Sequence, residues 1–228
     1  MPVQARFLLL FLIFFKPLTV FSDQTVCPNQ PEVTVYSANT ALIPGICNSS
    51  EKALGILSGY GLLPQRQIVI EIIKENIDHR GYKAYGKYDS RTDRIELMSY
   101  QSILMHHAEP VMYNEFFDHT HYSGAIAHEI AHAIFHQHSN NISPGPAPQE
   151  YLAHAVQLAV LPEERRNVII AKADVEAWGS GDAISDIYMA LEPTGFAVKS
   201  YKHLTTTEDP RAFIDILLNS KWFYVYIP

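Results

Sequence analysis

The chain of 228 residues is 47% hydrophobic and 18% charged, a composition typical of a globular protein and too apolar for a disordered one. Its formal net charge is -7, with 17 Lys and Arg against 24 Asp and Glu. Nucleic acids and anionic membranes both attract cationic surfaces, so this balance argues against either as a partner.

The first 22 residues have the pattern of a secretory signal peptide. An apolar run over residues 7–15 ends at Lys16, which makes it too short to cross about 30 Å of hydrocarbon. Small side chains favour cleavage between Ser22 and Asp23, with an uncleaved N-terminal anchor as the alternative. Cleavage removes two cations and no acid, which leaves a net charge of -9. We therefore expect a secreted or periplasmic protein with no stable membrane span, folded as a single domain over residues 23–228.

Two cysteines, Cys27 and Cys47, lie near the mature N-terminus. Export into an oxidising compartment favours a disulfide between them, and two free buried thiols are the alternative. No Cys-x-x-Cys pair accompanies them, so a role as metal ligands is disfavoured.

The N-terminal half is rich in β-strand patterns. Strands are expected at Glu32–Tyr36, Gln67–Ile73, Lys83–Tyr88 and Arg94–Met98. The last two flank a turn-forming segment, residues 89–93, and so predict a hairpin. A helix over Ser50–Leu57, with Ser49 or Ser50 as its cap, separates the first two strands. Gly59 and Gly61 end it.

From about residue 100 the pattern becomes helical. Helices are expected at Tyr122–Gln137, Gln149–Val160, Glu163–Val175, Ala183–Leu191 and Pro210–Leu218. A segment with three prolines and a glycine, residues 140–148, separates the first two of these helices. The sequence thus predicts an α+β fold, with an N-terminal mixed β-sheet region followed by a mainly helical half.

The first of these helices carries His128-Glu129-Ile130-Ala131-His132. Positions four apart lie one above the other on a helix, so His128 and His132 can direct two imidazole nitrogens to one point. Glu129 can reach a water molecule held there. Small or apolar neighbours indicate that this helix is buried, where an unused charged Glu129 would be costly. This spacing is typical of a zinc hydrolase, and Zn²⁺ is the expected cofactor.

A third ligand is expected from the next helix, which carries Glu150-Tyr151-Leu152-Ala153. With this glutamate the segment over residues 120–160 resembles the gluzincin branch of the zincin metallopeptidases, and within it the peptidase-MA-like proteins. There the corresponding segment often reads Glu-Gly-x-Ala, so Ala153 matches and Tyr151 departs from the pattern. The resemblance implies a zincin-like fold, zinc bound by His128, His132 and Glu150, and hydrolysis of peptide or protein substrates with Glu129 as general base.

His138 competes with Glu150 for the third position, because metzincins place their last histidine at this spacing. Those enzymes need a glycine midway for a sharp turn, and Phe135 occupies that place here. Glu163 and Glu164 are fallback ligands, although they resemble an ordinary acidic first turn of a helix.

The remaining candidates concern the surroundings of the metal. His154, four residues after Glu150, is a candidate partner of the ligands. Tyr201 and His203 are candidates for stabilising the oxyanion of a tetrahedral intermediate. Eight of the eleven histidines lie between residues 106 and 138. This density supports the alternative of a non-catalytic periplasmic zinc-binding or zinc-buffering protein, and a degenerate zincin acting as an interaction module is a third hypothesis.

Overall fold

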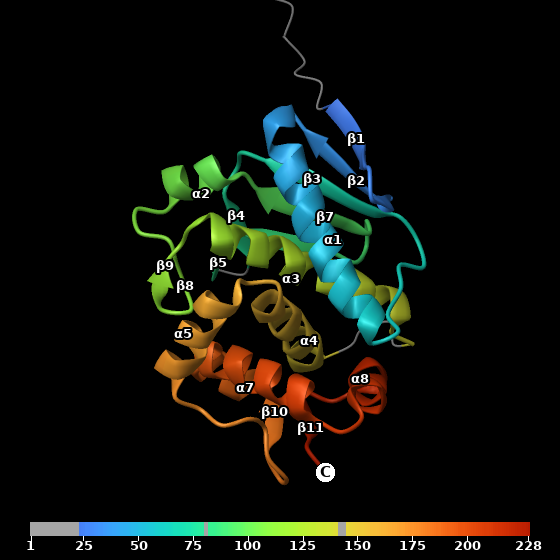
Figure 1. Cartoon of the computed structure of the whole chain (residues 1–228), viewed down its shortest axis with the longest axis vertical. Coiled ribbons are helices and arrows are strands. Elements are labelled where there is room, and N and C mark those ends of the chain that lie inside the picture. The colour runs from blue at the N-terminus through green and yellow to red at the C-terminus, as the bar shows by residue number, and fades with distance from the viewer. Residues whose placement is uncertain (1–22, 80–81, 141–144) are drawn as a thin grey trace, which may run out of the picture.

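The computed structural model describes residues 23–79, 82–140 and 145–228, and the predicted signal peptide lies outside these ranges. In chain order, the strands are β1 (Asp23–Cys27), β2 (Gln30–Ser37), β3 (Ile68–Ile73), β4 (Ile77–His79), β5 (Tyr82–Ala84), β6 (Gly86–Asp89), β7 (Arg94–Met98), β8 (Val111–Met112), β9 (Glu115–Phe116), β10 (Ala183–Ser185) and β11 (Tyr224–Tyr226). The helices are α1 (Ile43–Gly59), α2 (Tyr100–His106), α3 (His119–His138), α4 (Pro146–Ala159), α5 (Glu163–Ala173), α6 (Asp186–Leu191), α7 (Pro193–Thr206) and α8 (Pro210–Asn219), and a short 3-10 helix, Thr40–Leu42, precedes α1. This is the α+β fold that the sequence predicts (Figure 1).

Five strands form one mixed sheet in the order β1-β2-β3-β7-β6. The inner pairs β2–β3 and β3–β7 are parallel, and the outer pairs β1–β2 and β7–β6 are antiparallel. Several branched apolar side chains of the inner strands are fully buried, among them Val33, Val35 and Ile70. The predicted strands are confirmed, and so is the predicted hairpin, which β6 and β7 form. The segment predicted as one strand over Lys83–Tyr88 is divided between β5 and β6.

Helices α1 and α3 contact each other and contact strands of the sheet, and the main hydrophobic core lies between these layers (Figure 1). The predicted disulfide between Cys27 and Cys47 is present and joins β1 to α1. The predicted start of α1 is wrong, because the helix begins at Ile43 with a proline in its first turn. Ser49 and Ser50 therefore lie inside the helix, where their hydroxyls donate to carbonyls four residues earlier.

Helix α3 begins after Asp118, whose side chain accepts a hydrogen bond from the backbone of His121. Helix α4 packs against α3 and begins at Pro146, three residues before the predicted start at Gln149. Prolines fit the first turn of a helix, because amide groups there have no acceptor within the helix. Two of the prolines that we expected to hold the chain out of a helix, Pro146 and Pro148, thus lie in the first turn of α4, and the third falls outside the described residues.

The C-terminal half surrounds α4 with α7, α8 and the β10–β11 pair (Figure 1). The predictions of α5 and α8 are confirmed. The prediction of one helix over Ala183–Leu191 is wrong for its first turn, because residues 183–185 pair with residues 224–226 as strands. Helix α7 was not predicted. Within the described ranges, no helix has the length and apolar character needed to cross a membrane.

Candidate metal centre

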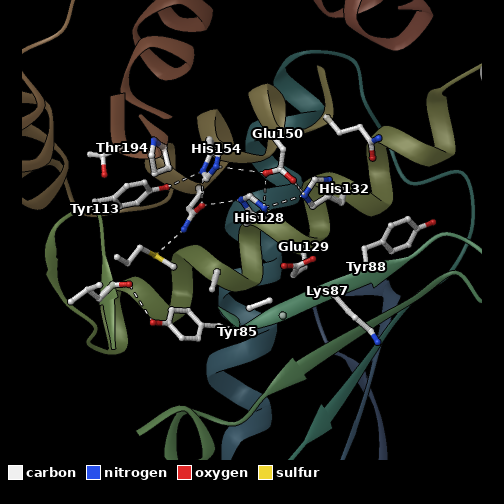
Figure 2. Close-up of a pocket in the computed structure, with 18 of the residues that line it drawn as sticks. Tyr85, Lys87, Tyr88, Tyr113, His128, Glu129, His132, Glu150, His154 and Thr194 are labelled. Carbon is white, nitrogen blue, oxygen red and sulfur yellow. Dashed lines mark hydrogen bonds and ion pairs between the residues drawn. The ribbon is translucent and has the colours of Figure 1, made fainter. Parts of the chain in front are cut away.

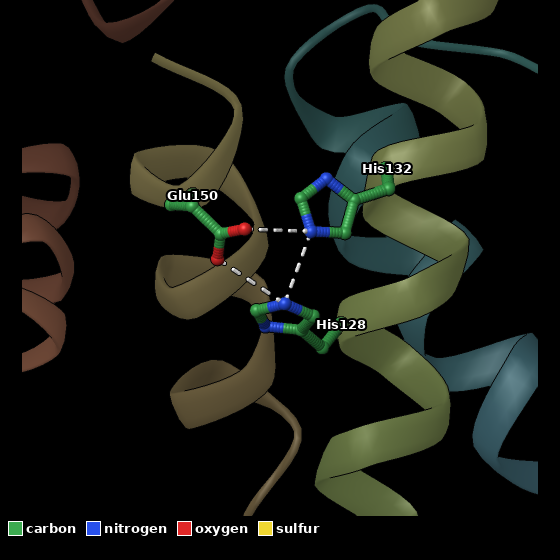
Figure 3. A group of neighbouring side chains, drawn as sticks. All are labelled: His128, His132 and Glu150. Atoms are coloured by element: carbon green, nitrogen blue, oxygen red, sulfur yellow. Dashed lines mark hydrogen bonds and ion pairs between the residues drawn. The ribbon is translucent and has the colours of Figure 1, made fainter. Parts of the chain in front are cut away.

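The His-Glu-x-x-His motif lies in a buried stretch of α3. Ala127 and Ala131 are 0% and 1% exposed, so the helix backbone lies close to its neighbours on that side. His128 and His132 extend from the other side toward α4, as their spacing predicts. Glu150 of α4 extends toward them, and the three side chains meet between the two helices (Figure 3).

The three side chains bring potential ligand atoms close together. The Nε2 atoms of His128 and His132 are 3.0 Å apart. In the Glu150 carboxylate, Oε2 lies 3.3 Å from Nε2 of His128 and Oε1 lies 3.4 Å from Nε2 of His132. One ligand atom from each residue lies within 4.8 Å of the others, so the group could hold a metal ion. Two imidazoles and one carboxylate are also the ligand types that zinc accepts in hydrolytic sites.

Opposing influences act on the Glu150 carboxylate. Burial acts to raise its pKa, but His132 and His128 outweigh burial through charge attraction and hydrogen bonds, and the pKa of Glu150 falls well below its ordinary value. The carboxylate is therefore held in its anionic form, the form that binds a cation.

A buried glutamine of α4 fixes the orientation of the first histidine. Oε1 of Gln157 lies 2.9 Å from Nδ1 of His128 and 3.2 Å from Nδ1 of His154. Its amide nitrogen lies 2.9 Å from the sulfur of Met112, an acceptor, which fixes the oxygen on the histidine side. An amide oxygen only accepts, so Nδ1 of His128 carries the proton of this hydrogen bond. The other ring nitrogen of His128, Nε2, faces His132 and Glu150 and is the atom that could bind a metal.

His154 closes the other side of the Glu150 carboxylate. Its Nε2 atom lies 3.6 Å from Oε2 of Glu150. Burial, together with the nearby His128, lowers the pKa of His154 to about 3, so its ring is neutral at physiological pH. The expected association of His154 with the ligand group is thus confirmed.

Glu129 does not join the three ligands but lies between α3 and the sheet-edge strand β6 (Figure 2). Its side chain is only 7% exposed and packs directly against Gly86, where there is no side chain to displace it. Burial raises the pKa of Glu129 to about 7, against the lowering effect of His128. A carboxyl with this pKa can both accept and return a proton near neutral pH.

These groups line one cavity of about 670 Å³, a size typical of sites for small molecules or a peptide segment. One wall is formed by Tyr85 and by strand β6 with Lys87 and Tyr88, and the opposite wall is α4 with the start of α7. The turn between β8 and β9, which carries Tyr113, closes one end (Figure 2).

A family model described as "Family of unknown function (DUF6639)" matches residues 33–226. The chain belongs to this family. No curated protein and no solved structure matches it. The match to the DUF6639 family begins within β2, leaves out β1, and covers the other strands of the sheet, α3, α4 and the C-terminal helices, so the cavity lies within the family's shared region.

In this member of the DUF6639 family, the alternative third ligand lies elsewhere. Nε2 of His138 hydrogen-bonds the carbonyl oxygen of Leu63 at 2.7 Å, and its Nδ1 atom lies 3.2 Å from the side-chain amide of Gln65. Because α3 continues through Phe135 to His138, the chain makes no sharp turn that would bring this histidine to the other two. The alternative ligand His138 is therefore wrong for this structure.

The two candidates for oxyanion stabilisation also lie outside the cavity. The His203 ring is 8% exposed, and its Nδ1 atom lies 2.6 Å from the hydroxyl of Tyr151. The Tyr201 ring lies against the guanidinium of Arg166 at 5.4 Å. Neither residue is among those that line the cavity. Both belong to α7, an unpredicted helix that turns them away from the metal ligands.

The dense histidines do not gather into a second centre. His106 contacts the backbone carbonyl of Lys74, and His119 stacks on the ring of Tyr100 at 3.8 Å. In the part of the chain that the structure describes, one group of at least three potential metal ligands is present, formed by the two motif histidines and Glu150.

Two residues of the site escaped the sequence-based analysis. Gln157 follows Glu150 by seven residues, two helical turns, so it lies on the same face of α4 as Glu150 and His154. That spacing could have identified it. Gly86 carries no such signal, because its importance comes from the approach of Glu129 from a helix more than 40 residues further along the chain.

Proposed function

We propose that this protein is an exported zinc-dependent metallopeptidase of the gluzincin type. The observation that carries the proposal is the convergence of His128, His132 and Glu150 at 3.0–3.4 Å, with Glu129 held apart from them in the same cavity. An ion cluster that only stabilised the fold would be complete with the two histidines and Glu150. It would not need a separate buried carboxyl group, that of Glu129, in the same cavity.

Each residue of the site has a separate role in the proposed reaction. Zinc bound by the three ligands would supply Lewis acidity and lower the pKa of a water molecule toward 7. Glu129 accepts the proton of the attacking water and returns it to the leaving amine. Gln157 holds His128 with Nε2 toward the ligand group, and the anionic Glu150 balances part of the cation's charge.

The arrangement of the sheet and of the two ligand-bearing helices supports the resemblance to zincins. A mixed sheet with an antiparallel edge strand lies beside the motif helix, and the carboxylate ligand comes from the next helix of the chain. We infer a single zincin-like domain over residues 23–228.

The substrate is proposed to be a peptide or protein. The cavity is bordered by the edge strand of the sheet, and its lining combines aromatic rings with polar side chains such as Asn114, Gln149 and Gln157, which suits a chain of amides. The disulfide between Cys27 and Cys47 agrees with a secreted or periplasmic location. The acidic charge gives no support to nucleic acid as a partner.

The test compares the zinc-loaded mature protein with its Glu129→Gln variant. We expect about one zinc per chain in both by elemental analysis, and hydrolysis of a mixed library of internally quenched peptides that falls by about 10²–10⁴-fold in the variant. Equal hydrolysis by both proteins would refute the assignment of the base. Several zinc ions per chain with no hydrolysis by either would instead favour the non-catalytic zinc-binding protein.

A further inference from the structure

The last strand of the chain, β11, has one open edge. The strand pairs with β10 over its whole length, and just beyond it Ile227 donates from its backbone to the carbonyl oxygen of Asp182. Hydrogen-bonded and non-bonded pairs alternate along an antiparallel ladder, so the backbone groups of Tyr224 and Tyr226 point away from β10. Among the residues that the structure describes, none forms a backbone hydrogen bond with these outward groups.

A groove of about 680 Å³ lies beside this open edge, on the side of the molecule where the β10–β11 pair and α8 meet (Figure 1). The rings of Tyr224 and Tyr226 contact each other at 5.1 Å, so both side chains lie on the same face of the strand. The groove is lined by β11, by the end of α8 and by the segment between them, with Ile216, Asn219, Ser220, Lys221 and Trp222.

The two outer strands of the main sheet differ from β11 in what their edges carry. Strand β1 begins with Asp23 and has an irregular register at Cys27, and β6 carries Lys87 and Asp89. Charged side chains and bulges of this kind protect an edge strand from pairing with another chain. Strand β11 reads Tyr-Val-Tyr, pairs with β10 in a regular register and contains no charged residue. This contrast indicates that the edge of β11 is one that pairs.

A second copy of the chain can supply the matching strand. When two copies meet about a two-fold axis at Val225, their β11 strands run antiparallel, and Tyr224 of each copy lies opposite Tyr226 of the other. These two residues carry the outward backbone groups, so each such pair can exchange two N–H···O hydrogen bonds. A two-fold interface uses the same surface on both partners and is the commonest symmetry of protein oligomers.

The exposed aromatic area suits an interface of modest size. The exposed fractions are 69% for Trp222, 44% for Tyr224 and 62% for Tyr226. An aromatic side chain can bury about 150–250 Å², so these rings offer roughly 500–900 Å² over two copies. Stable interfaces begin at about 1,200 Å² in total, and the edge backbone and Ile216 add to the rings. The area therefore predicts a reversible dimer and not a permanent one.

We propose that the protein forms a two-fold dimer in which the β11 strands of two copies pair antiparallel. The partner strand occupies the groove beside α8, and the two β10–β11 pairs join into one four-stranded sheet. The Tyr224 and Tyr226 rings of both copies then lie together on one face of that sheet. The dimer uses no residue of the metal centre, so it does not depend on the proposed peptidase function.

The experiment measures the association of the mature protein, residues 23–228, by sedimentation equilibrium. One double variant carries Tyr224→Lys with Tyr226→Lys, and a second carries Tyr224→Glu with Tyr226→Glu. Each variant alone places like charges opposite each other across the two-fold axis, whereas an equimolar mixture of the two places opposite charges there. The matched control is Phe116→Lys, which changes a 74% exposed aromatic residue on β9, away from the groove (Figure 1).

We expect the wild-type protein to dimerise with a Kd in the micromolar range. Each double variant should raise this Kd by about tenfold or more, and the equimolar mixture should recover association close to wild type. Phe116→Lys should leave the Kd unchanged. Because both copies are acidic, added salt should screen their repulsion and strengthen the wild-type dimer.

A second variant keeps the test decisive if the charged variants melt at a lower temperature than wild type. Tyr226→Pro removes an N–H group that points away from β10, and edge strands tolerate proline at such positions. This variant should keep the β10–β11 pair and lose the dimer.

Three results would overturn the proposal. The first is a wild-type protein that stays monomeric at about 1 mM, which would leave the edge to a different chain. The second is a Kd within twofold of wild type in both the double lysine variant and Tyr226→Pro, which would place the interface elsewhere. The third is an equimolar mixture that associates no better than either charged variant alone, which would exclude the pairing of Tyr224 with Tyr226.

Discussion

Replacing Gly86 by alanine should disable the general base without removing the metal. The added methyl group would lie 2.8 Å from Cγ and 3.1 Å from Oε1 of Glu129, and 3.1 Å from a methyl of Leu97. Carbon atoms in favourable contact are about 3.5–4.0 Å apart, so the Glu129 side chain must retreat by roughly 0.7 Å or more. Leu97 is fully buried and cannot give way on the other side.

The size of the effect follows from this displacement. Forcing an extra methyl into a packed site costs about 1–3 kcal/mol. In a domain of this size each kcal/mol lowers the melting temperature by about 2–4 °C, which gives a drop of roughly 2–12 °C. A catalytic group misplaced by about 1 Å can lose a factor of 10² in rate.

The assay measures zinc content, melting temperature and peptide hydrolysis for Gly86→Ala beside Gly55→Ala. Gly55 is exposed within α1, and a methyl there would meet no atom within 4 Å, so this control should be stabilised by about 0.5–1 kcal/mol and keep full activity. Wild-type turnover in Gly86→Ala would refute the placement of Glu129. Loss of zinc from that variant would show that the strand supports the ligands and not the base.

Three further predictions concern the metal, the disulfide and pH. Gln157→Leu should weaken zinc binding about 10–100-fold in competition with a chromophoric chelator, because His128 loses its fixed orientation, and unchanged affinity would contradict this role. Replacing Cys27 and Cys47 by alanine removes a crosslink between residues 20 apart and should cost about 3 kcal/mol in denaturant unfolding, whereas an unchanged midpoint would exclude this contribution. Burial lowers the pKa of His203 below its ordinary value of about 6.5, so the unfolded chain binds a proton first as pH falls. The stability from this group is present above about pH 6.5 and lost below it, and His203→Asn should flatten the fall in melting temperature between pH 7.5 and 5.5 in the presence of a chelator.

The sequence is most informative where its signals are local. The alternation around Val35, the branched residues around Ile70 and the turn before Arg94 fix their own strands, because each pattern needs no distant partner. The strand over residues 183–185 exists only because residues 224–226 pair with it, so a helical pattern was the best local interpretation. Prolines misled at the start of α4, since a proline ends a helix from within but begins one at its first turn. At α1 the error came from Ser49 and Ser50, which suit a helix cap but lie inside the helix.

Some residues of the candidate site can likewise be predicted from local patterns, and others cannot. His128 and His132 are neighbours by helix periodicity, and Glu150 follows on the next helix, so the ligand group was within reach of sequence. The surroundings of the ligands depend on packing between elements distant in the chain. The approach of Gly86 to Glu129 and the inward turn of Tyr113 arise from the docking of β6 and of a small hairpin, and no spacing rule encodes either.

The ligands come from two helices that belong to different layers of the molecule. Helix α3 packs against the sheet, whereas α4 is surrounded by the C-terminal helices. An ion held by both would act as a crosslink between the N-terminal and C-terminal halves and would add to the stability of their packing. Resistance to proteolysis would then increase with the free zinc concentration. A shortage of zinc would shorten the lifetime of the protein as well as abolish its activity.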